Sequence, residues 1–300
     1  MTGPFLACDW GTTNVRAWVV GEDGAPGPER GFPLGVGRLR PGEASIRFRE
    51  EIRPGMNAEG LPALLCGMIG SNLGWTPVAY VPCPTSMADL ASGLVTVSGG
   101  EAPVRIVPGV RGPGAFGGSD VMRGEETQIL GWAARHAPSS EHLVCHPGTH
   151  AKWAVVRDGR LKRFATVMTG ELYAVLSRHG VLATDGPDDD EAAFAEGVEA
   201  AGDGSALAAR LFTGRTRVVA DGRPASGTAS YLSGLLVGAD AATGPDLVGW
   251  SGDPRVTLIG EPVLCRRYRP ALERRGWTVD TYDGDRAVLD GLTTLAEMAA

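Results

Sequence analysis

The chain has 300 residues, of which 43% are hydrophobic and 21% charged, and its formal net charge is −7. This length favours two domains over one core, and the composition is that of an ordinary soluble globular protein. The acidic balance argues against non-specific binding of nucleic acid, and no stretch approaches the ~18 apolar residues that span a membrane. Because the N-terminal segment lacks a basic region and a signal-peptide core, we expect a cytoplasmic protein.

The cysteines are five in number and scattered along the chain, at Cys8, Cys66, Cys83, Cys145 and Cys265. None forms a Cys-x-x-Cys pair, so the sequence indicates neither a zinc site nor a disulfide framework. They are typical of small buried side chains.

The first third of the chain is predicted to be rich in strands. Strands are expected over residues 5–9, 14–20 and roughly 29–35, and the first two form a hairpin because "NVRAWVV" alternates with period two. A short helix over 43–53, the apolar run "LPALLCGM" and a strand over 104–110 follow. The glycine-rich run "RGPGAFGGSD", residues 111–120, predicts a flexible loop or hinge.

The opening pattern returns in the second half of the chain. A helix is predicted from near Gly124, and residues 142–168 again give a strand, a Gly-Thr turn and further strands. Helices are then expected over about 169–179, 189–201, 205–213 and 226–242, before "VTLIG", another helix, and a last strand and helix. This weak duplication indicates two domains of one architecture.

The Gly-Thr turns are the chemically informative feature. In "LACDWGTTNVRAWVV", residues 6–20, the first strand ends at Asp9 and is followed by Gly11, Thr12, Thr13 and Asn14. Backbone amides at a glycine turn converge on an anion, adjacent hydroxyls add donors, and a carboxylate can hold Mg²⁺. A plain hairpin turn is the alternative. The later "HPGTH", with Gly148 and Thr149, repeats the pattern and favours phosphate binding.

These motifs resemble those of a known superfamily of kinases. "DWGTTN" is similar to the first phosphate motif of the actin/hexokinase/Hsp70-like ATPases, "HPGTHAKWAVV" to the second, and "VTLIGEPVLCRRY" to the adenosine motif. Together with "CGMIGSNLGW", "SDVMRGEETQILG" and "MTGELYAVLSRHG", they resemble the 2-dehydro-3-deoxygalactonokinase family over nearly the whole chain. His146 and the segment Gly-Glu-Pro at residues 260–262 depart from the family pattern, and the second departure concerns the adenine and ribose contacts.

The resemblance implies an α/β fold of two ribonuclease-H-like domains with an interdomain cleft, residues 1–118 and 119–300. It implies ATP-dependent phosphorylation of 2-dehydro-3-deoxy-D-galactonate at its 6-hydroxyl, with Mg²⁺ organised by Asp9. The nucleotide residues that it implies are Gly11, Thr12, Thr13, Asn14, Gly148, Thr149, His150, Lys152, Gly260 and Glu261. Another sugar or sugar-acid kinase, or a nucleotide-binding sensor without an acceptor pocket, remains the alternative.

A sugar kinase usually needs a carboxylate that accepts the proton of the attacking hydroxyl. Asp120 closes the glycine-rich run and Glu125 opens the next helix, whose dipole would keep it ionised. Glu126 is a third candidate. We favour Asp120, because aspartate is the usual base in kinases similar to this one, although capping and first-turn acidic bias explain at least one of the three.

An acidic protein that binds a sugar acid needs a local positive site, preferably a bidentate guanidinium. Arg16 and Arg123 are the candidates, while Asn72 and Trp75 could contact the sugar acid and Glu171 a hydroxyl. Arg16 could instead face solvent, Trp75 could be core, and Glu171 could only stabilise a helix N-terminus. The expected partner is a small molecule, with no nucleic acid and no membrane, and a homodimer is left open.

Overall fold

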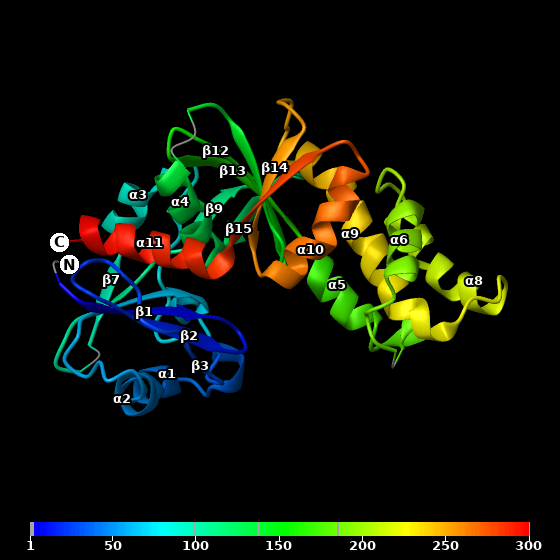
Figure 1. The fold of residues 1–300 in the computed structure, drawn as a ribbon. Coiled ribbons are helices and arrows are strands. Elements are labelled where there is room, and N and C mark those ends of the chain that lie inside the picture. Colours follow the sequence, from blue (N-terminus) through cyan, green and yellow to red (C-terminus); the bar gives the residue numbers. More distant parts are fainter. Residues whose placement is uncertain (1–2, 99, 137–138, 185, 300) are drawn as a thin grey trace. The chain divides into compact units, whose positions relative to one another are not determined.

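The computed structural model describes residues 3–98, 100–136, 139–184 and 186–299. The chain forms two compact units (Figure 1). Unit 1 comprises Met1–Glu141, Val156–Arg163 and Gly284–Ala300, and unit 2 comprises His142–Val155 and Phe164–Asp283. The boundary therefore differs from the one expected after residue 118, since the segment 119–141 and the C-terminal helix both pack with the N-terminal part.

Unit 1 is built on a six-stranded sheet of order β3-β2-β1-β4-β8-β7. Its strands are β1 (Phe5–Trp10), β2 (Val15–Val20), β3 (Arg30–Phe32), β4 (Ala63–Gly67), β7 (Val95–Val97) and β8 (Val104–Ile106). The first three pair antiparallel, as the predicted hairpin requires, while β4 and β8 run parallel to β1. This order and these directions define a ribonuclease-H-like sheet.

Helical segments lie against this sheet. The predicted helix over 43–53 is a continuous run of α1 (Glu43–Arg47), η2 (Phe48–Ile52) and α2 (Arg53–Gly55), and it buries Phe48 and Ile52 in the core under the sheet. Short turns η1 (Val36–Arg38) and η3 (Met68–Gly70) follow strand ends. The strand β1 reads as a nearly continuous apolar run because it is central in the sheet and buried along most of its length.

The glycine-rich run is not a hinge. Residues 110–122 form a β-hairpin of β9 (Val110–Pro113) and β10 (Ser119–Met122), which β5 (Val81–Pro82) extends to a three-stranded sheet. The amide of Gly114 donates to the carbonyl of Gly118 and closes the turn. The glycines serve this tight turn, since Gly117 and Gly118 have φ of 89° and 71°.

Two long helices of unit 1 pack together at glycines. α4 (Glu125–His136) begins where the sequence predicts, and α11 (Gly284–Met298) lies beside it (Figure 1). A Cβ atom added at Gly131 would lie 2.3 Å from the carbonyl oxygen of Ala287, and one at Gly291 would lie 2.2 Å from that of Thr127. Only glycine permits so close an approach of the two backbones.

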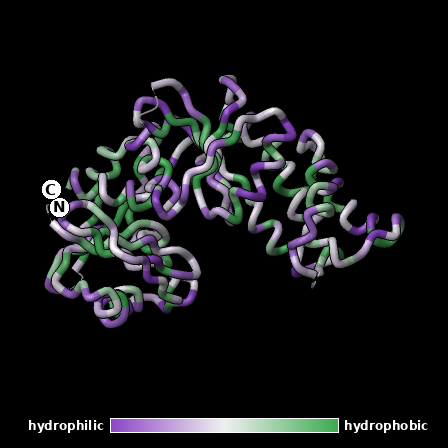
Figure 2. Tube along the Cα trace, in the orientation of Figure 1, coloured by the Kyte–Doolittle hydropathy of each residue, from purple (hydrophilic) through white to green (hydrophobic). Residues whose placement is uncertain are grey.

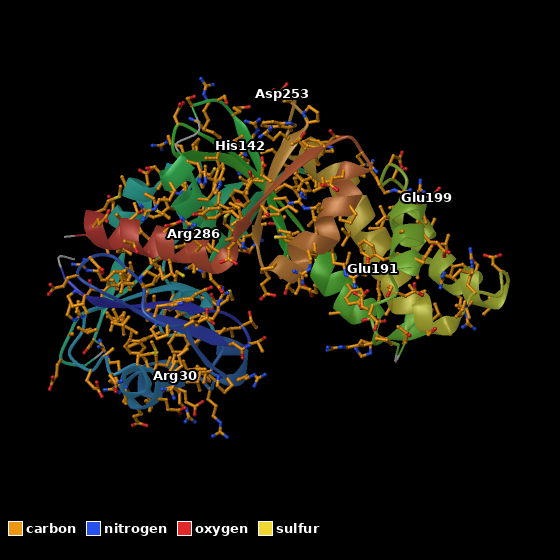
Figure 3. The ribbon with its side chains drawn as sticks, in the orientation of Figure 1. Arg30, His142, Glu191, Glu199, Asp253 and Arg286 are labelled. Carbon is orange, nitrogen blue, oxygen red and sulfur yellow. The ribbon has the colours of Figure 1, made fainter. Side chains whose placement is uncertain are left out.

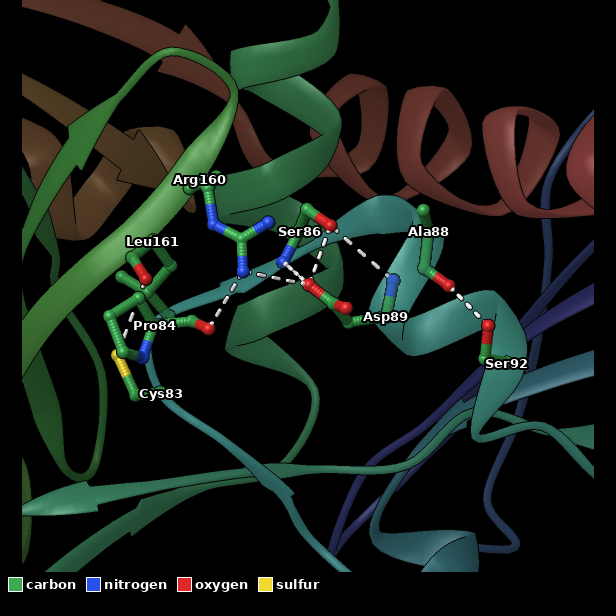
Figure 4. Close-up of polar contacts among 8 residues, drawn as sticks. All are labelled: Cys83, Pro84, Ser86, Ala88, Asp89, Ser92, Arg160 and Leu161. Carbon is green, nitrogen blue, oxygen red and sulfur yellow. Dashed lines mark hydrogen bonds and ion pairs between the residues drawn. The ribbon is translucent and has the colours of Figure 1, made fainter.

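A small polar cluster fixes β6 (Thr85–Ser86) and α3 (Met87–Ser92) to the beginning of β13 (Figure 4). Ser86 and Asp89 form a capping box, in which each side chain accepts a hydrogen bond from the other residue's backbone amide. Arg160 donates to Asp89 at 3.1 Å and to the carbonyl of Pro84 at 3.0 Å.

Unit 2 repeats the sheet order, as the duplication in the sequence predicts. The second sheet runs β15-β14-β11-β12-β13-β6, and the order of its first five strands matches that of β8, β4, β1, β2 and β3. Their bounds are β11 (His142–His146), β12 (Ala151–Arg157), β13 (Arg160–Val167), β14 (Arg255–Gly260) and β15 (Thr278–Asp283), with residues 156–163 of β12 and β13 counted in unit 1. The pairs β11–β14 and β14–β15 are parallel. The predicted strands of residues 142–168 are thus confirmed, and β11 and β14 end at the second Gly-Thr turn and at Gly260.

The helices of unit 2 are α5 (Thr169–Leu176), η4 (Gly180–Leu182), α6 (Glu191–Ala200), α7 (Leu207–Leu211), α8 (Thr213–Val219), η5 (Ala225–Gly227), α9 (Thr228–Leu247) and α10 (Pro262–Glu273). The helix α9 is buried along most of its length, and α6 packs closely on it at Gly197 and Gly234. Hydrophobic residues lie in both strands and helices, while the most hydrophilic residues gather in loops and at helix surfaces (Figure 2). Charged side chains such as Glu191 and Glu199 project from the helices (Figure 3). Among the described residues, no helix has the length and apolar character that crossing a bilayer requires.

Candidate active site

The first Gly-Thr turn joins β1 to β2 in unit 1. The amide of Gly11 donates to the carbonyl of Asn14, and the amide of Gly37 donates to the carbonyl of Thr12. Thr12 and Thr13 are exposed residues, and their amides donate to no acceptor within the described part of the chain. The carbonyls of this turn accept hydrogen bonds from the chain, while these two amides have no partner among the described residues. Such amides can donate to a bound anion.

Asp9 lies in β1 beside Arg16 of β2, and their side chains form an ion pair. The Arg16 Nη2 atom lies 2.6 Å from Asp9 Oδ2, and Nη1 of the same guanidinium donates to Asp285 at the start of α11. Burial lowers the pKa of Arg16, but the two carboxylates raise it by more, so its net pKa is above the usual value. Arg16 is therefore only partly exposed, and its guanidinium already binds two carboxylates.

The end of β4 meets both Asp9 and the chain that leads into α4. The Cys66 thiol lies 3.8 Å from Asp9 Oδ1, and a Cβ atom added at Gly67 would lie 2.6 Å from the carbonyl oxygen of Trp10. Gly67 has φ of 85° and Gly124 has φ of 115°, and a Cβ on Gly124 would lie 3.3 Å from the Cα atom of Gly67. The turn before α4 is thus held against the end of β4, the strand that pairs with the strand carrying Asp9.

The candidate bases occupy different elements of unit 1. Asp120 lies in β10, where its Oδ1 accepts a hydrogen bond from the amide of Val121 at 2.7 Å. Glu125 opens α4 and accepts from the amide of Arg123 at 3.0 Å. Both carboxylates are partly exposed. Asp120 is therefore part of a strand and not of a hinge, and Glu125 follows directly on Gly124.

Glu126, the third candidate, is completely buried. Its carboxylate accepts hydrogen bonds from the amide of Gly124 at 2.7 Å and from the Thr127 hydroxyl at 3.1 Å. Burial, followed by the nearby charge of Glu125, raises the pKa of Glu126 to about 7. A side chain with no exposed surface cannot reach a substrate hydroxyl, so we assign Glu126 the role of holding the turn at Gly124.

This pKa predicts a specific dependence of stability on pH. Because the folded-state pKa of Glu126 is about 7, above its ordinary value of 4.5, its stabilising contribution is complete below about pH 4.5 and is lost as the pH rises through 7. The loss is on the order of 3 kcal/mol of unfolding free energy. Glu126→Gln should flatten this part of the curve, since the amide can serve both hydrogen bonds without a charge.

Denaturant titrations of wild type and Glu126→Gln between pH 5 and 8 measure this difference. Glu125→Gln is the matched control, because it removes the neighbouring charge and should move the midpoint to lower pH. Parallel curves for wild type and Glu126→Gln would contradict the assignment.

Arg123 has an unusual environment for a guanidinium. Its Nη2 donates to the carbonyl of Val78 at 2.8 Å, and its charge lies 4.3 Å from the centre of the Tyr80 ring. Its Nε and Nη1 are buried and have no acceptor among the described residues. Unpaired buried donors are costly, and Arg123 as a whole residue is partly exposed, so an anion that reached its guanidinium would satisfy donors that the described residues leave unpaired.

Asn72 and Trp75 lie in the loop that follows η3. Gly70, the last residue of η3, lies close to Arg123, because a Cβ atom added there would lie 2.8 Å from Arg123 Nη1. Asn72 is exposed there. The Trp75 ring lies 5.4 Å from that of Phe48 and packs against the core of unit 1, which favours a structural role for it.

The second Gly-Thr turn lies in unit 2, after β11. Its Thr149 carbonyl accepts from the amide of Glu171, and the His150 ring is hydrogen-bonded to the Glu171 carboxylate. A Cβ atom added at Gly170 would lie 2.6 Å from the carbonyl oxygen of Gly148. The N-terminus of α5 is therefore pressed against this turn, and Glu171 belongs to the second turn and not to the loop of Asn72 in unit 1.

The other nucleotide candidates lie around the same turn. Gly260, at the end of β14, has φ of 150°, and a Cβ atom there would lie 3.5 Å from the Pro147 carbonyl oxygen. Glu261 is the exposed residue before α10. Lys152 is buried in β12, where its Nζ donates to the Thr166 hydroxyl at 3.0 Å.

A pocket of about 210 Å³ opens beside the second turn. Gly148 and Gly170 line it, together with apolar side chains that the sequence did not single out, from α9 and α10. These are Leu236, Val237, Val263 and Leu264; the polar lining is Thr169, Tyr173, Asp188, Ser233, Arg267 and Tyr268. Val263 and Leu264 lie within the adenosine-like motif "VTLIGEPVLCRRY", and this was the available signal. Nothing local in the α9 sequence marks its contribution.

The side chains around Asp9 suit a magnesium ion that keeps most of its water ligands, and not one that is enclosed by protein ligands. Within the described ranges, no group of three or more histidine, cysteine, aspartate or glutamate residues could enclose a metal. Mg²⁺ is commonly held by one or two carboxylates, water and substrate phosphates. Asp9 Oδ1, whose neighbour is a weakly donating thiol at 3.8 Å, fits this role.

Two ribonuclease-H-like sheets, each with a Gly-Thr turn after its first strand, define the chain as a carbohydrate kinase of the actin-like ATPase fold. The model of the 2-keto-3-deoxy-galactonokinase family matches residues 9–295, and the chain belongs to this family.

Several relatives support this placement. A Rhizobium meliloti (strain 1021) protein named as a probable 2-dehydro-3-deoxygalactonokinase is 36% identical, over 98% of this chain and 97% of its own. The 2-dehydro-3-deoxygalactonokinase of Escherichia coli (strain K12) is 33% identical over the full length of both. A crystal structure from Sinorhizobium meliloti with the same provisional kinase name has a TM-score of 0.86 and 34% identity, with 98% of each chain covered.

Proposed function

We propose that this chain transfers the γ-phosphoryl group of ATP to the 6-hydroxyl of 2-dehydro-3-deoxy-D-galactonate, giving the 6-phosphate and ADP. Family membership over residues 9–295 carries the proposal. The curated relatives of similar length bear the name of this kinase. Such a reaction is a step in the breakdown of galactonate.

Each Gly-Thr turn supplies phosphate ligands in this proposal. At the first turn these are the available amides and hydroxyls of Thr12 and Thr13. At the second they come from Gly148 and Thr149, and the adjoining pocket takes the adenosine, whose flat apolar base suits the side chains of Val237 and Val263. Lys152 acts by fixing β12 beside this turn, because its amine is buried and bound to Thr166.

Asp9 organises Mg²⁺ in this proposal, directly or through water. When bound, the ion neutralises negative charge on the phosphates during transfer. The chain itself holds the Asp9 carboxylate in place, through the ion pair with Arg16 and through the contact with the end of β4. We therefore reassign Arg16 from the substrate to the support of Asp9.

Arg123 binds the carboxylate of the sugar acid in this proposal, because it is partly exposed and its Nε and Nη1 have no acceptor among the described residues. Arg123→Lys keeps the charge but loses the planar fork, and a charge-assisted pair contributes about 1.5–3 kcal/mol. The KM for the sugar acid should therefore rise about tenfold or more, while the KM for ATP stays near that of the wild type. Steady-state kinetics with each substrate varied in turn measures the split.

Arg105→Lys is the matched control, because Arg105 lies in β8 and donates to the carbonyl of Ala299. Its kinetics should match those of the wild type. If Arg123→Lys weakened ATP and left the sugar acid unaffected, Arg123 would serve the nucleotide and the acid pocket would lie elsewhere. Arg16→Lys, the parallel variant, should reduce turnover more than it changes the KM for the acid.

The decisive test of the activity is ADP release with a panel of sugars and 2-keto-3-deoxy acids. The proposed kinase should release ADP in proportion to added 2-dehydro-3-deoxy-D-galactonate, with phosphate on its 6-oxygen. A non-catalytic sensor would bind ATP without acid-dependent ADP release, and a kinase for another sugar acid would prefer a different member of the panel. A cytoplasmic location and a homodimer stay predictions for localisation and light-scattering measurements.

A further inference from the structure

A buried carboxylate in unit 2 lies directly behind the proposed nucleotide pocket. Asp240 is in the middle of α9, within an otherwise apolar and small-residue stretch, and only 2% of its surface is exposed. An ionisable group at such a position is costly unless several donors satisfy it. Burial raises the pKa of Asp240, and the hydrogen bonds that it accepts oppose this rise.

Three donors from three other elements converge on this carboxylate. The Trp153 indole of β12 donates to Oδ1 at 2.7 Å, and the Thr169 hydroxyl of α5 donates to Oδ2 at 2.6 Å. The Tyr268 hydroxyl of α10 also donates to Oδ2. Thr169 and Tyr268 line the pocket, whereas Trp153 does not.

The contact with Thr169 continues to the second Gly-Thr turn. Thr169 is the first residue of α5, and Gly170, the next residue, abuts the Gly148 carbonyl so closely that a Cβ atom would lie 2.6 Å from it. The amide of Glu171 then donates to the Thr149 carbonyl at 2.9 Å. A displacement of Thr169 would therefore also displace the second Gly-Thr turn.

We propose that Asp240 is a positioning residue for nucleotide binding, which fixes Thr169 and Tyr268 in the pocket wall and, through Thr169, the second Gly-Thr turn. The proposal rests on the assignment of this pocket to ATP. Asp240 contacts no substrate, so its effect is on the affinity for nucleotide and not on the affinity for the sugar acid. Its removal loosens the α5 terminus and the α10 wall together.

The test compares variants that each alter one part of the cluster. Asp240→Asn removes the charge, Thr169→Val and Tyr268→Phe each remove one pocket-side donor, and Trp153→Phe removes the donor on the opposite side. Calorimetric titration with the non-hydrolysable analogue AMP-PNP reports nucleotide affinity, and steady-state kinetics reports both KM values. Thermal melting reports the structural cost of each change.

Asp240→Asn should weaken AMP-PNP binding and raise the KM for ATP about tenfold, with the KM for the sugar acid unchanged. Trp153→Phe should lower the thermal midpoint but leave nucleotide affinity within about twofold of the wild type. Thr169→Val should weaken AMP-PNP clearly in the wild-type background and much less in the Asp240→Asn background, because residues that act through one contact are not additive.

Equal losses of nucleotide affinity in Asp240→Asn and Trp153→Phe would overturn the proposal and leave Asp240 a general stabiliser of unit 2. Additive losses in the double variant would also overturn it. If Asp240→Asn does not fold, unchanged AMP-PNP affinity in both Thr169→Val and Tyr268→Phe overturns it. A wild-type protein that phosphorylates the acid but binds AMP-PNP elsewhere, with these variants unaffected, would refute this inference alone; one that binds no nucleotide would refute the proposed function as well.

Discussion

Replacing Asp9 by asparagine is expected to lower kcat by at least ~100-fold, about 2.7 kcal/mol of activation free energy, with a thermal midpoint close to that of the wild type. The carboxamide cannot supply the charge that holds Mg²⁺ or its waters. The fold should tolerate the change because Arg16 keeps a second carboxylate partner in Asp285. Single-turnover kinetics at several Mg²⁺ concentrations, together with thermal melting, measures both effects.

Asp285→Asn is the matched control for this experiment. It removes the other partner of Arg16 while leaving the Asp9 carboxylate in place, so kcat should stay within a few-fold of the wild type. An equal loss in both variants would assign the effect to the ion-pair network and not to the metal. Near-normal turnover of Asp9→Asn would remove Asp9 from the mechanism, and collapse of its fold would make it structural.

The second large effect should come from the proton acceptor. Asp120→Asn and Glu125→Gln each preserve shape and remove the base, and the true base should lose about 10²–10⁴ in kcat with little change in ATP affinity. The structure distinguishes the surroundings of Asp120 from those of Glu125, which the sequence could not. Glu125 follows the turn that touches the end of β4 beside Asp9, whereas Asp120 lies in the β9–β10 hairpin.

Glu126→Gln is an internal control in this set. Because the side chain of Glu126 is buried, the substitution should change the pH dependence of the unfolding free energy and leave kcat nearly unchanged. The measurement is kcat across pH for all three variants. If Asp120→Asn and Glu125→Gln both keep more than about a tenth of the activity, a loss below ~1.4 kcal/mol, neither is the base. Positioning and charge stabilisation would then account for the catalysis.

The sequence by itself determined the duplicated architecture and the place of both Gly-Thr turns. Alternation in "NVRAWVV" and the repeated strand–turn–strand pattern are local signals, and hairpins are specified by neighbouring residues. The antiparallel pairing of β1 with β2 and the matching strand orders of the two sheets agree with them. The helix that begins at Glu125 was predictable for the same reason, since its first turn is acidic and apolar residues follow in the next turns.

Tertiary contacts decided which polar side chains are available for chemistry. Arg16 and Arg123 were both candidates in the sequence, yet Arg16 is paired with Asp9 and Asp285, while Arg123 has two buried nitrogens without an acceptor in the part of the chain that the structure describes. The glycine-rich run became a hairpin because β10 pairs with β9 and β5 pairs with β9 on its other side. Asp240 has no local motif at all, because its three donors come from segments 28 to 87 residues away, and only the packed fold brings them together.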